Sequence, residues 1–387
     1  MSGFEFNTTK SIISEVGCLA NICTFCESLN IANPLIVTDQ GIVNCGLLAQ
    51  LESLIDNKIA FTVFDDVVAD PLESVILSAS SKAELAQIDG VIGFGGGSSM
   101  DTAKLVAVLA KGKQKLSDMY GVGQVNSDRL PLILIPTTAG TGSEVTPIAI
   151  VTTGETTKAG IVSPILLPDI ALLDAQLTTG LPSHITAATG IDAMVHAIEA
   201  YTSKIQKNPY SDMLAKEALR LLSNNIETAC IDGNNLVARQ NMLLGACIAG
   251  QAFANAPVAA VHALAYPLGG HFHISHGLSN SLVLPHVMRF NLHSCAMLYS
   301  ELAPLINPEA DTNQADENIA KDFISAIEQL IKDLLLPTTL KEMNIKPEQL
   351  PMLAKDAMLQ QRLLVNNPRE LTYQDALNIY YSAYGEL

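Results

Sequence analysis

The 387-residue chain is poor in basic residues, in aromatic residues and in cysteine, and each shortage excludes a class of protein. It has 22 Lys and Arg against 39 Asp and Glu, a net charge of −17, so its surface is unsuited to nucleic acid or to anionic membranes. It has no Trp, and its seven scattered cysteines do not form a disulfide framework. Cys23 and Cys26 form a CxxC pair on an apolar helical pattern, which favours core thiols over a zinc or redox site.

Signals for secretion and for membrane insertion are missing as well. The start, MSGFEFNTTKSIISEVG, has neither a charged beginning nor a long apolar run, and it resembles an edge strand. The longest apolar region, 242–270, is interrupted by Gln251, Asn255, Pro257 and His262, which favours a buried helix pair over a membrane span. We therefore expect a cytoplasmic protein with no membrane partner and no nucleic-acid partner.

The pattern of apolar residues changes near residue 182. Before this point, short β-rich runs alternate with helical segments; the runs are PLIVT, FTVFDD, VIGFG, LILIP and IALLD. This alternation predicts a parallel sheet covered by helices. After it, long patterns such as SDMLAKEALRLLSNNIETA are almost all helical. The length allows two full cores, so we predict an α/β domain over residues 1–182 and an all-helical domain over 183–387.

Residues of the types that bind metals stand at two places in the helical half. Asp192 and His196 are four residues apart in GIDAMVHAIEA, so a helix places both on one face. In HALAYPLGGHFHISH, a Pro-Leu-Gly-Gly break puts His262 near the end of one predicted helix and His276 at the start of the next. A lone Asp/His pair is more often an exposed polar face, but burying this many unpartnered titratable groups is expensive. One carboxylate and three imidazoles suit a divalent first-row metal that keeps open positions for a substrate oxygen.

A glycine-rich segment predicts a second ligand. DGVIGFGGGSSMDTAKLVAVLA indicates a strand over 91–94, a glycine turn, and a helix from about Ser98 that Ser98 or Ser99 caps, with Asp101 in its first turn. Glycines at such a turn let backbone amides approach a phosphate. The segment departs from G-x-G-x-x-G because Ser98 takes the third glycine's place, so by itself it fits a tight structural turn equally well.

Two further segments fit a nucleotide site. LPLILIPTTAGTGSEVT is an apolar strand followed by small hydroxyl and glycine residues, which are typical of the strand ends where open α/β sheets bind ligands. Asp39 ends another apolar strand, in PLIVTDQG. Its carboxylate could accept hydrogen bonds from an adenosine ribose and repel a 2′-phosphate; the alternative is a turn aspartate before Gly41.

Taken together, these motifs resemble the iron-containing, or group III, alcohol dehydrogenases over essentially the whole chain. GGGSSMD, PTTAGTGSEVT, ATGIDAMVHAIEAY and HGLSNSLVLPHVMRFN stand in the order and spacing of that family. The resemblance implies that the first domain binds a dinucleotide, that the second binds the metal, and that the active site lies in the cleft between them. The implied metal ligands are Asp192, His196, His262 and His276. The implied cofactor residues are Asp39, Gly95, Gly96, Gly97, Ser98, Asp101, Thr137, Thr138, Thr141, Ser143 and Lys158.

The chain departs from the family at one position. Many members have a second histidine where this sequence has Tyr266, in HALAYP. That histidine is a candidate for the proton route, so here Tyr266, His271, His273 or water takes the role, and the sequence does not choose among them.

The resemblance implies reversible oxidation of a small alcohol to an aldehyde or ketone, with a hydride passed to a nicotinamide and the metal acting on the substrate oxygen. We expect NAD, because of Asp39, and Fe²⁺, for which Zn²⁺ can substitute during purification. A homo-oligomer, a homodimer or larger, is expected.

Three alternatives keep some of these features. Polyol dehydrogenases and maleylacetate-type reductases share the fold. A related lyase acts on a sugar phosphate, but segments 183–201 and 258–288 contain no Lys or Arg to bind a phosphate. A non-catalytic protein with a structural metal would need a closed shell of protein ligands, whereas one Asp and three His leave positions open.

Overall fold

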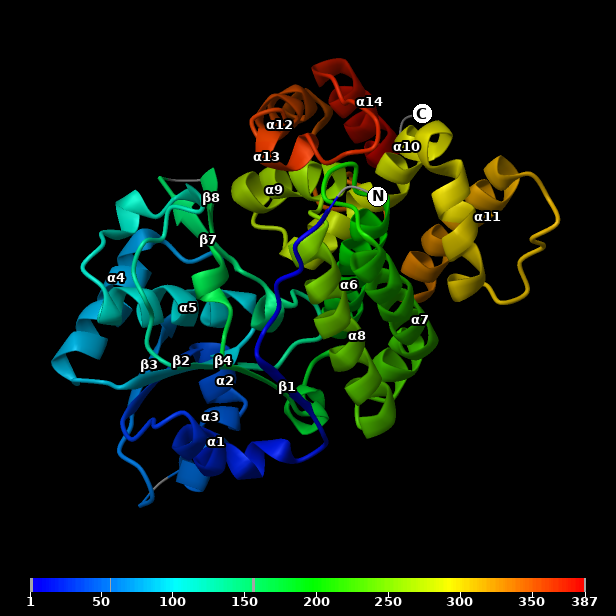
Figure 1. Cartoon of the computed structure of the whole chain (residues 1–387). Helices are drawn as coiled ribbons and strands as arrows, with labels where there is room; N and C mark the ends of the chain where they lie inside the picture. The colour runs from blue at the N-terminus through cyan, green and yellow to red at the C-terminus, as the bar shows by residue number, and fades with distance from the viewer. Residues whose placement is uncertain (1–2, 56, 155–156, 386–387) are drawn as a thin grey trace. The chain divides into compact units, whose positions relative to one another are not determined.

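The computed structural model describes residues 3–55, 57–154 and 157–385, which form two compact units (Figure 1). The first, called the sheet unit below, comprises Asn7–Leu181 and Asn234–Cys247. The second, the helical unit, comprises Met1–Phe6, Pro182–Gly233 and Ile248–Leu387. A single division after residue 182 would place segment 1–6 in the sheet unit and segment 234–247 in the helical unit, whereas here each belongs to the other unit. The predicted domain boundary itself stays a prediction.

A six-stranded parallel sheet lies at the centre of the sheet unit. Its strand order is β1-β9-β6-β4-β2-β3, and every neighbouring pair is parallel. The strands are β1 (Ser11–Ser14), β2 (Pro34–Asp39), β3 (Thr62–Val67), β4 (Gly90–Gly95), β6 (Leu132–Pro136) and β9 (Ile170–Leu173). The five β-rich runs are all strands, and the N-terminal segment supplies edge strand β1, so both expectations are confirmed.

Helices cover both faces of this sheet (Figure 1). One face carries α1 (Ile22–Ser28), α2 (Gln40–Asn44) and α3 (Leu47–Ile55), and the other carries α4 (Glu73–Leu85) and α5 (Gly97–Lys111). Neighbouring residues of one strand point to opposite faces: Ile36 packs in the first layer, Leu35 and Val37 in the second. Burial on both faces explains why the strands are almost continuously apolar. Cys23 and Cys26 are free thiols on α1, packed in this core as expected.

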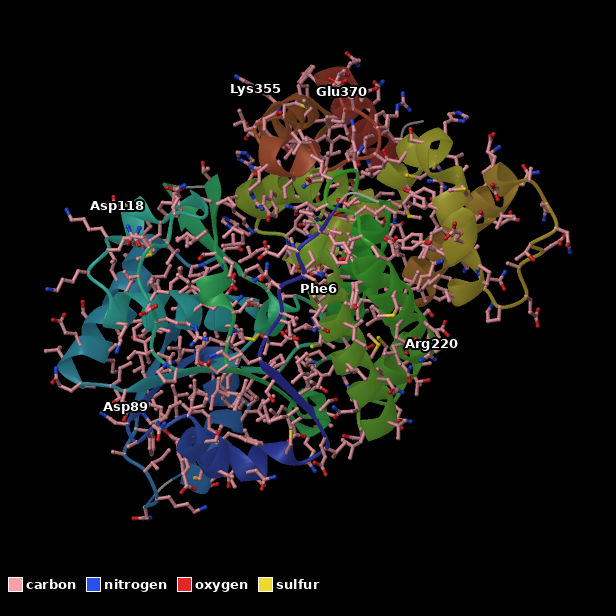
Figure 2. The ribbon with its side chains drawn as sticks, in the orientation of Figure 1. Phe6, Asp89, Asp118, Arg220, Lys355 and Glu370 are labelled. Carbon is pink, nitrogen blue, oxygen red and sulfur yellow. The ribbon has the colours of Figure 1, made fainter. Side chains whose placement is uncertain are left out.

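The turns before β2 and β4 are joined by one carboxylate. Asp89, labelled in Figure 2, accepts hydrogen bonds from the backbone amides of Ala32 and Asn33 at 2.9 and 2.8 Å. Pro34 is then in register with Gly90, at the start of both strands. Because the strands are parallel and start together, their carboxyl ends also meet at one edge of the sheet.

A second, three-stranded sheet was not predicted. It contains β5 (Gly121–Val122), β8 (Thr157–Val162) and β7 (Ile148–Thr153), and β7 and β8 pair in antiparallel fashion. These strands read IAIVTT and TKAGIV, in which threonine, glycine and lysine interrupt the apolar residues. Many positions of these strands are exposed or half-buried, so the strands need no continuous apolar run. The apolar pattern of the sequence therefore did not indicate β7 and β8.

From residue 182 onward the regular elements of the described chain are helices, as expected. They are α6 (Ser183–Thr202), α7 (Pro209–Ile231), α8 (Leu236–Asn255), α9 (Ala260–Phe272), α10 (His276–Ile306), α11 (Asp316–Asp333), α12 (Leu350–Ala357), α13 (Gln361–Leu364) and α14 (Tyr373–Tyr384). Among the described residues no single helix is long and apolar enough to cross a bilayer; α8 and α9 reach that length only as a pair bent by 108°.

The helix boundaries around His262 differ from the prediction. The chain breaks between α8 and α9, where Pro257 lies, and α9 then continues through Pro267 to Phe272. The next residue, His273, is the C-cap, and its φ of 54° is in the left-handed region. The predicted Pro-Leu-Gly-Gly break was therefore wrong. The helix continues because an internal proline removes only one hydrogen bond of a helix that is held by its neighbours. His262 therefore lies in the first turn of α9 and not near its carboxyl end.

Candidate metal centre and cofactor loops

Three helices of the helical unit bring Asp192, His196, His262 and His276 together. Asp192 and His196 lie one turn apart on α6, His262 is in the first turn of α9, and His276 is the first residue of α10. One potential ligand atom from each of the four lies within 4.8 Å of all the others. The Nε2 atoms of His276 and His196 lie 3.6 and 4.0 Å from Asp192 Oδ1. The predicted ligand types thus form one cluster.

The geometry and donor types of this cluster fit a divalent metal. Bonds of about 2.1 Å would place two ligand atoms about 3.4 Å apart at a tetrahedral angle and about 4.2 Å apart when opposite. The two separations of 3.6 and 4.0 Å from Asp192 Oδ1 lie in this range. Asp192, His196 and His262 are buried, whereas the side chain of His276 is 31% exposed. His276 is therefore the most solvent-accessible of the four potential ligands.

The protonation states expected of ligands are favoured as well. Burial by itself would raise the pKa of Asp192, but attraction to His276, His196 and His262 and a hydrogen bond from Asn280 hold it below its usual value. Burial, together with repulsion from the other two imidazoles, lowers the pKa of His262 well below its usual value. The cluster therefore offers an ionised carboxylate and a neutral imidazole, which are the forms that bind metals.

Sequence reasoning missed Glu199, which lies behind His262. Its carboxylate accepts a hydrogen bond from His262 Nδ1 at 2.7 Å and from the backbone amides of Ala259 and Val261 at 3.0 and 2.7 Å. Glu199 follows Asp192 by seven residues, so both project from one face of α6. A charged residue at that spacing, in a helix that is otherwise apolar there, was the available signal.

Asn280 was also missed. It stands one turn after His276 on α10 and is fully buried. Its Nδ2 donates to Asp192 Oδ1 at 2.5 Å and lies 3.3 Å from Nε2 of both His262 and His276. The amide therefore orients the carboxylate of Asp192 from the α10 side.

The three candidates for the proton route lie in different surroundings. The ring of Tyr266, one turn after His262, has its centre 5.9 Å from that of His276. His271 is bound to Asp356, with 2.5 Å between Nε2 and Oδ2, and His273 is exposed at the end of α9. Neither His271 nor His273 belongs to the four-residue cluster. Tyr266, by contrast, is in ring contact with a member of the cluster.

In the sheet unit, the cofactor candidates gather at the carboxyl ends of adjacent strands. Asp39 ends β2, Gly95 ends β4, and Thr137 follows β6, whose neighbour is β4. The chain goes from β2 outward to β3 and then back to β4 on the other side of β2, so β2 and β4 flank a topological switch point. Open α/β sheets bind ligands at such a point.

The carboxylate of Asp39 accepts hydrogen bonds from the start of α2 and from the glycine loop before α5. Oδ1 accepts from the amides of Gly41 and Ile42 and so caps α2, while Oδ2 accepts from Ser99 Oγ at 2.9 Å. The turn interpretation of Asp39 is therefore confirmed, and the same carboxylate also contacts the glycine loop.

Two of the three glycines of the turn, Gly95 and Gly97, have no room for a side chain. Gly95 has a φ of 150°, and a Cβ there would lie 2.8 Å from Ser99 Oγ; a Cβ at Gly97 would lie 2.9 Å from Thr141 Cγ2. Helix α5 starts at Gly97, one residue before the predicted start near Ser98. The predicted cap was wrong: Gly96 is the N-cap residue and no side chain caps the helix, because Ser99 donates to Asp39 instead.

Asp101, which was predicted in the first turn of α5, lies just beyond that turn and belongs to a buried hydrogen-bond network. It accepts hydrogen bonds from Ser143 Oγ at 2.6 Å and from the Ile150 amide at 3.0 Å. The fully buried ammonium of Lys104 donates to Ser143 Oγ at 2.8 Å and to the Ile148 carbonyl at 2.7 Å. Burial lowers the pKa of Lys104, and the charge of Asp101 opposes this shift. The network links α5 to the loop after β6.

The remaining cofactor candidates differ in exposure and contacts. Thr137 is buried and its amide donates to the Gly95 carbonyl at 3.0 Å, which joins the two loops. Thr138, Thr141 and Ser98 are half-buried. Lys158 lies on β8, where its ammonium is 2.6 Å from Asp70 Oδ1.

Comparisons with known proteins place this geometry in a family. A family model described as iron-containing alcohol dehydrogenase matches residues 9–175, and one described as Fe-containing alcohol dehydrogenase family, C-terminal, matches residues 186–384. Long-chain-alcohol dehydrogenase 1 of Geobacillus thermodenitrificans is 40% identical over 95% of this chain and 93% of its own length. NAD-dependent methanol dehydrogenase of Bacillus methanolicus is 31% identical over 95% and 96%.

Comparison with solved structures agrees with the family matches. A crystal structure of 1,3-propanediol oxidoreductase superposes with a TM-score of 0.95 at 32% identity, covering 99% of this chain and 100% of that one. The chain therefore belongs to the iron-containing alcohol dehydrogenase family. It is an oxidoreductase that transfers a hydride between a nicotinamide cofactor and a small alcohol or aldehyde.

Proposed function

We propose that this enzyme is an NAD-dependent alcohol dehydrogenase whose metal is held by Asp192, His196, His262 and His276. The observation that carries the proposal is the convergence of these four residue types from three helices to within 4.8 Å. A divalent metal at this place would act as a Lewis acid on the substrate oxygen. Fe²⁺ is the proposed ion, because of the family and the hard Asp192 oxygen, with Zn²⁺ as a substitute.

The residues of the chain then divide the remaining tasks. The ionised carboxylate of Asp192 and the neutral imidazole of His262 supply ligand atoms without first losing protons. Tyr266, whose ring lies beside that of His276, is the proposed carrier of the alcohol proton to solvent. His271 and His273 are weaker candidates, because one is bound to Asp356 and the other is exposed.

For the cofactor we propose NAD over NADP. The amides of Gly95, Gly96 and Gly97 would contact the pyrophosphate, and α5 begins there with its favourable dipole. Asp39 would bind the adenosine ribose and disfavour a 2′-phosphate. The other proposed contacts are Ser98, Asp101, Thr137, Thr138, Thr141, Ser143 and Lys158. The NAD dependence of the methanol dehydrogenase relative supports the choice.

The assembly and the compartment are proposed separately. We propose a cytoplasmic homo-oligomer, most simply a homodimer. Edge strand β1 pairs with β9 alone among the described strands, so its outer edge offers backbone groups to a second copy. All seven cysteines are free, which suits a reducing compartment.

The direct test is NAD reduction with a panel of short alcohols and NADH oxidation with the matching aldehydes. We expect turnover with several of these substrates, loss of turnover after chelation, and the highest turnover after reconstitution with Fe²⁺. Full activity of the metal-stripped protein would contradict the proposed metal centre. Turnover restricted to polyols or to maleylacetate would favour the related branches that share the fold.

A further inference from the structure

Glu199 is a buried acid that the proposed chemistry does not use. It lies on α6, three residues after His196, and only 4% of its surface is exposed. Its two oxygens accept three hydrogen bonds, from His262 Nδ1 and from the amides of Ala259 and Val261. Removing a carboxylate from water is expensive, so full satisfaction of its oxygens indicates a specific placement.

Two of these bonds give α9 its first turn. Ala259, the N-cap residue of α9, has no polar side chain, and no side-chain cap from within the helix is present. The carboxylate of Glu199 takes that role from another helix, because it binds the amides of Ala259 and Val261 and lies at the positive end of the helix dipole. His262 is the next residue after Val261, so the cap determines where the backbone of His262 lies.

The third bond determines which ring nitrogen of His262 is free. A neutral imidazole has one N–H and one lone pair. An ionised Glu199 can only accept hydrogen bonds, so beside it Nδ1 at 2.7 Å is the donor, which places the proton on Nδ1 and leaves the lone pair on Nε2. Nε2 faces the cluster, where it lies 3.3 Å from Asn280 Nδ2.

We propose that Glu199 is a positioning residue of the metal centre, which caps α9 and holds His262 with its Nε2 lone pair directed at the metal. The inference rests on the proposed metal centre. An outer partner of this kind typically raises metal affinity by about 10- to 100-fold.

The test compares metal affinity of the full-length protein and of Glu199→Gln, by competition with a chelator, using Co²⁺ and Zn²⁺ as probes. Glutamine keeps the shape but removes the charge, and one of its two terminal atoms is a donor. We expect about 10- to 100-fold weaker binding and an altered visible spectrum of bound Co²⁺. Glu144→Gln is the matched control. Glu144 is an equally buried glutamate of the sheet unit, and none of the four potential ligands belongs to that unit, so its variant should bind metal like the wild type.

A double-mutant cycle separates positioning from a general loss of structure. If Glu199 acts through His262, then Glu199→Gln should weaken metal binding far less in a His262→Ala background than alone. Equal losses in both backgrounds would overturn the proposal, and so would wild-type affinity of Glu199→Gln. If the wild type itself binds neither metal, the proposed metal centre fails instead. Should Glu199→Gln fold poorly, judged by circular dichroism, Glu199→Asp replaces it in the same cycle.

Discussion

Gly277 of α10 lies directly against the backbone of Ala188 in α6. A Cβ at Gly277 would be 2.3 Å from the carbonyl oxygen of Ala188 and 2.8 Å from its carbonyl carbon. Real Cβ atoms do not approach backbone so closely, so the two helices can meet in this way only through a glycine. His276 precedes Gly277, and Asp192 is one turn after Ala188. The close approach therefore brings His276 Nε2 to 3.6 Å from Asp192 Oδ1.

Gly277→Ala should force α6 and α10 apart. We expect a lower unfolding temperature, corresponding to about 1–3 kcal/mol for overpacking, and weaker metal binding because His276 moves away from Asp192. Gly180→Ala is the control, since a Cβ there meets nothing within 4 Å. Thermal unfolding and chelator competition measure the two effects, and a Gly277→Ala variant with wild-type metal affinity would show that the helix contact does not position His276.

The ligand assignment predicts a division among the histidine variants. Asp192→Ala and His276→Ala should lose metal and hydride transfer, while the sheet unit keeps its fold because none of its elements contains a proposed ligand. His271→Ala and His273→Ala should keep the metal, since the first is bound to Asp356 and the second is exposed. Metal analysis of the four purified variants tests this. Metal loss in His271→Ala together with retention in His276→Ala would require a different site.

Cofactor preference should depend on the charge of Asp39. A 2′-phosphate near this carboxylate is disfavoured by about one to a few kcal/mol. Asp39→Gly should therefore lower the ratio of kcat/KM with NAD to kcat/KM with NADP, which narrows the preference for NAD. This variant also loses the cap on α2, because Oδ1 binds the amides of Gly41 and Ile42. Asp39→Asn keeps an acceptor for those amides and removes only the charge. Narrowing in both variants supports the electrostatic argument, and equal use of the two cofactors by the wild type would refute it.

Stability should fall in mild acid because of His286. Burial and then the nearby Arg289 lower its pKa to about 4 in the folded protein, and Nδ1 hydrogen-bonds with Ser382 Oγ. Between about pH 6.5 and pH 4 the unfolded chain binds a proton at this residue that the folded protein does not, so stability decreases as the pH is lowered through this window. The full effect is up to about 3 kcal/mol.

His286→Gln removes this titration. We expect the unfolding temperature of the variant to decrease less than that of the wild type between pH 7 and pH 4.5. His293→Gln, at an exposed position of the same helix, controls for the loss of one imidazole. Parallel pH curves for the wild type and His286→Gln would contradict the prediction.

Features that depend on neighbouring residues were predictable from the sequence. The strands β2, β4 and β6 are short, apolar and bounded by turn residues, so their positions follow from composition within a few residues. Asp192 and His196 share a helix face because of their spacing alone. The order of the family motifs, which is a property of the linear chain, sufficed to indicate the family.

What only the tertiary structure decided involves residues far apart in the chain. Glu199 and His262 are 63 residues apart, and Asn280 and Asp192 are 88 apart, so no local pattern relates them. No local pattern indicates how α9 forms either. Its first turn is capped by a residue of α6, and the helix continues through Pro267 against the local propensity. Local periodicity determined which elements form and which residues could bind a metal or a cofactor. The packing of helices, as at Gly277 and Ala188, decided which of those residues meet, because contacts between distant segments depend on side-chain shape across the whole core.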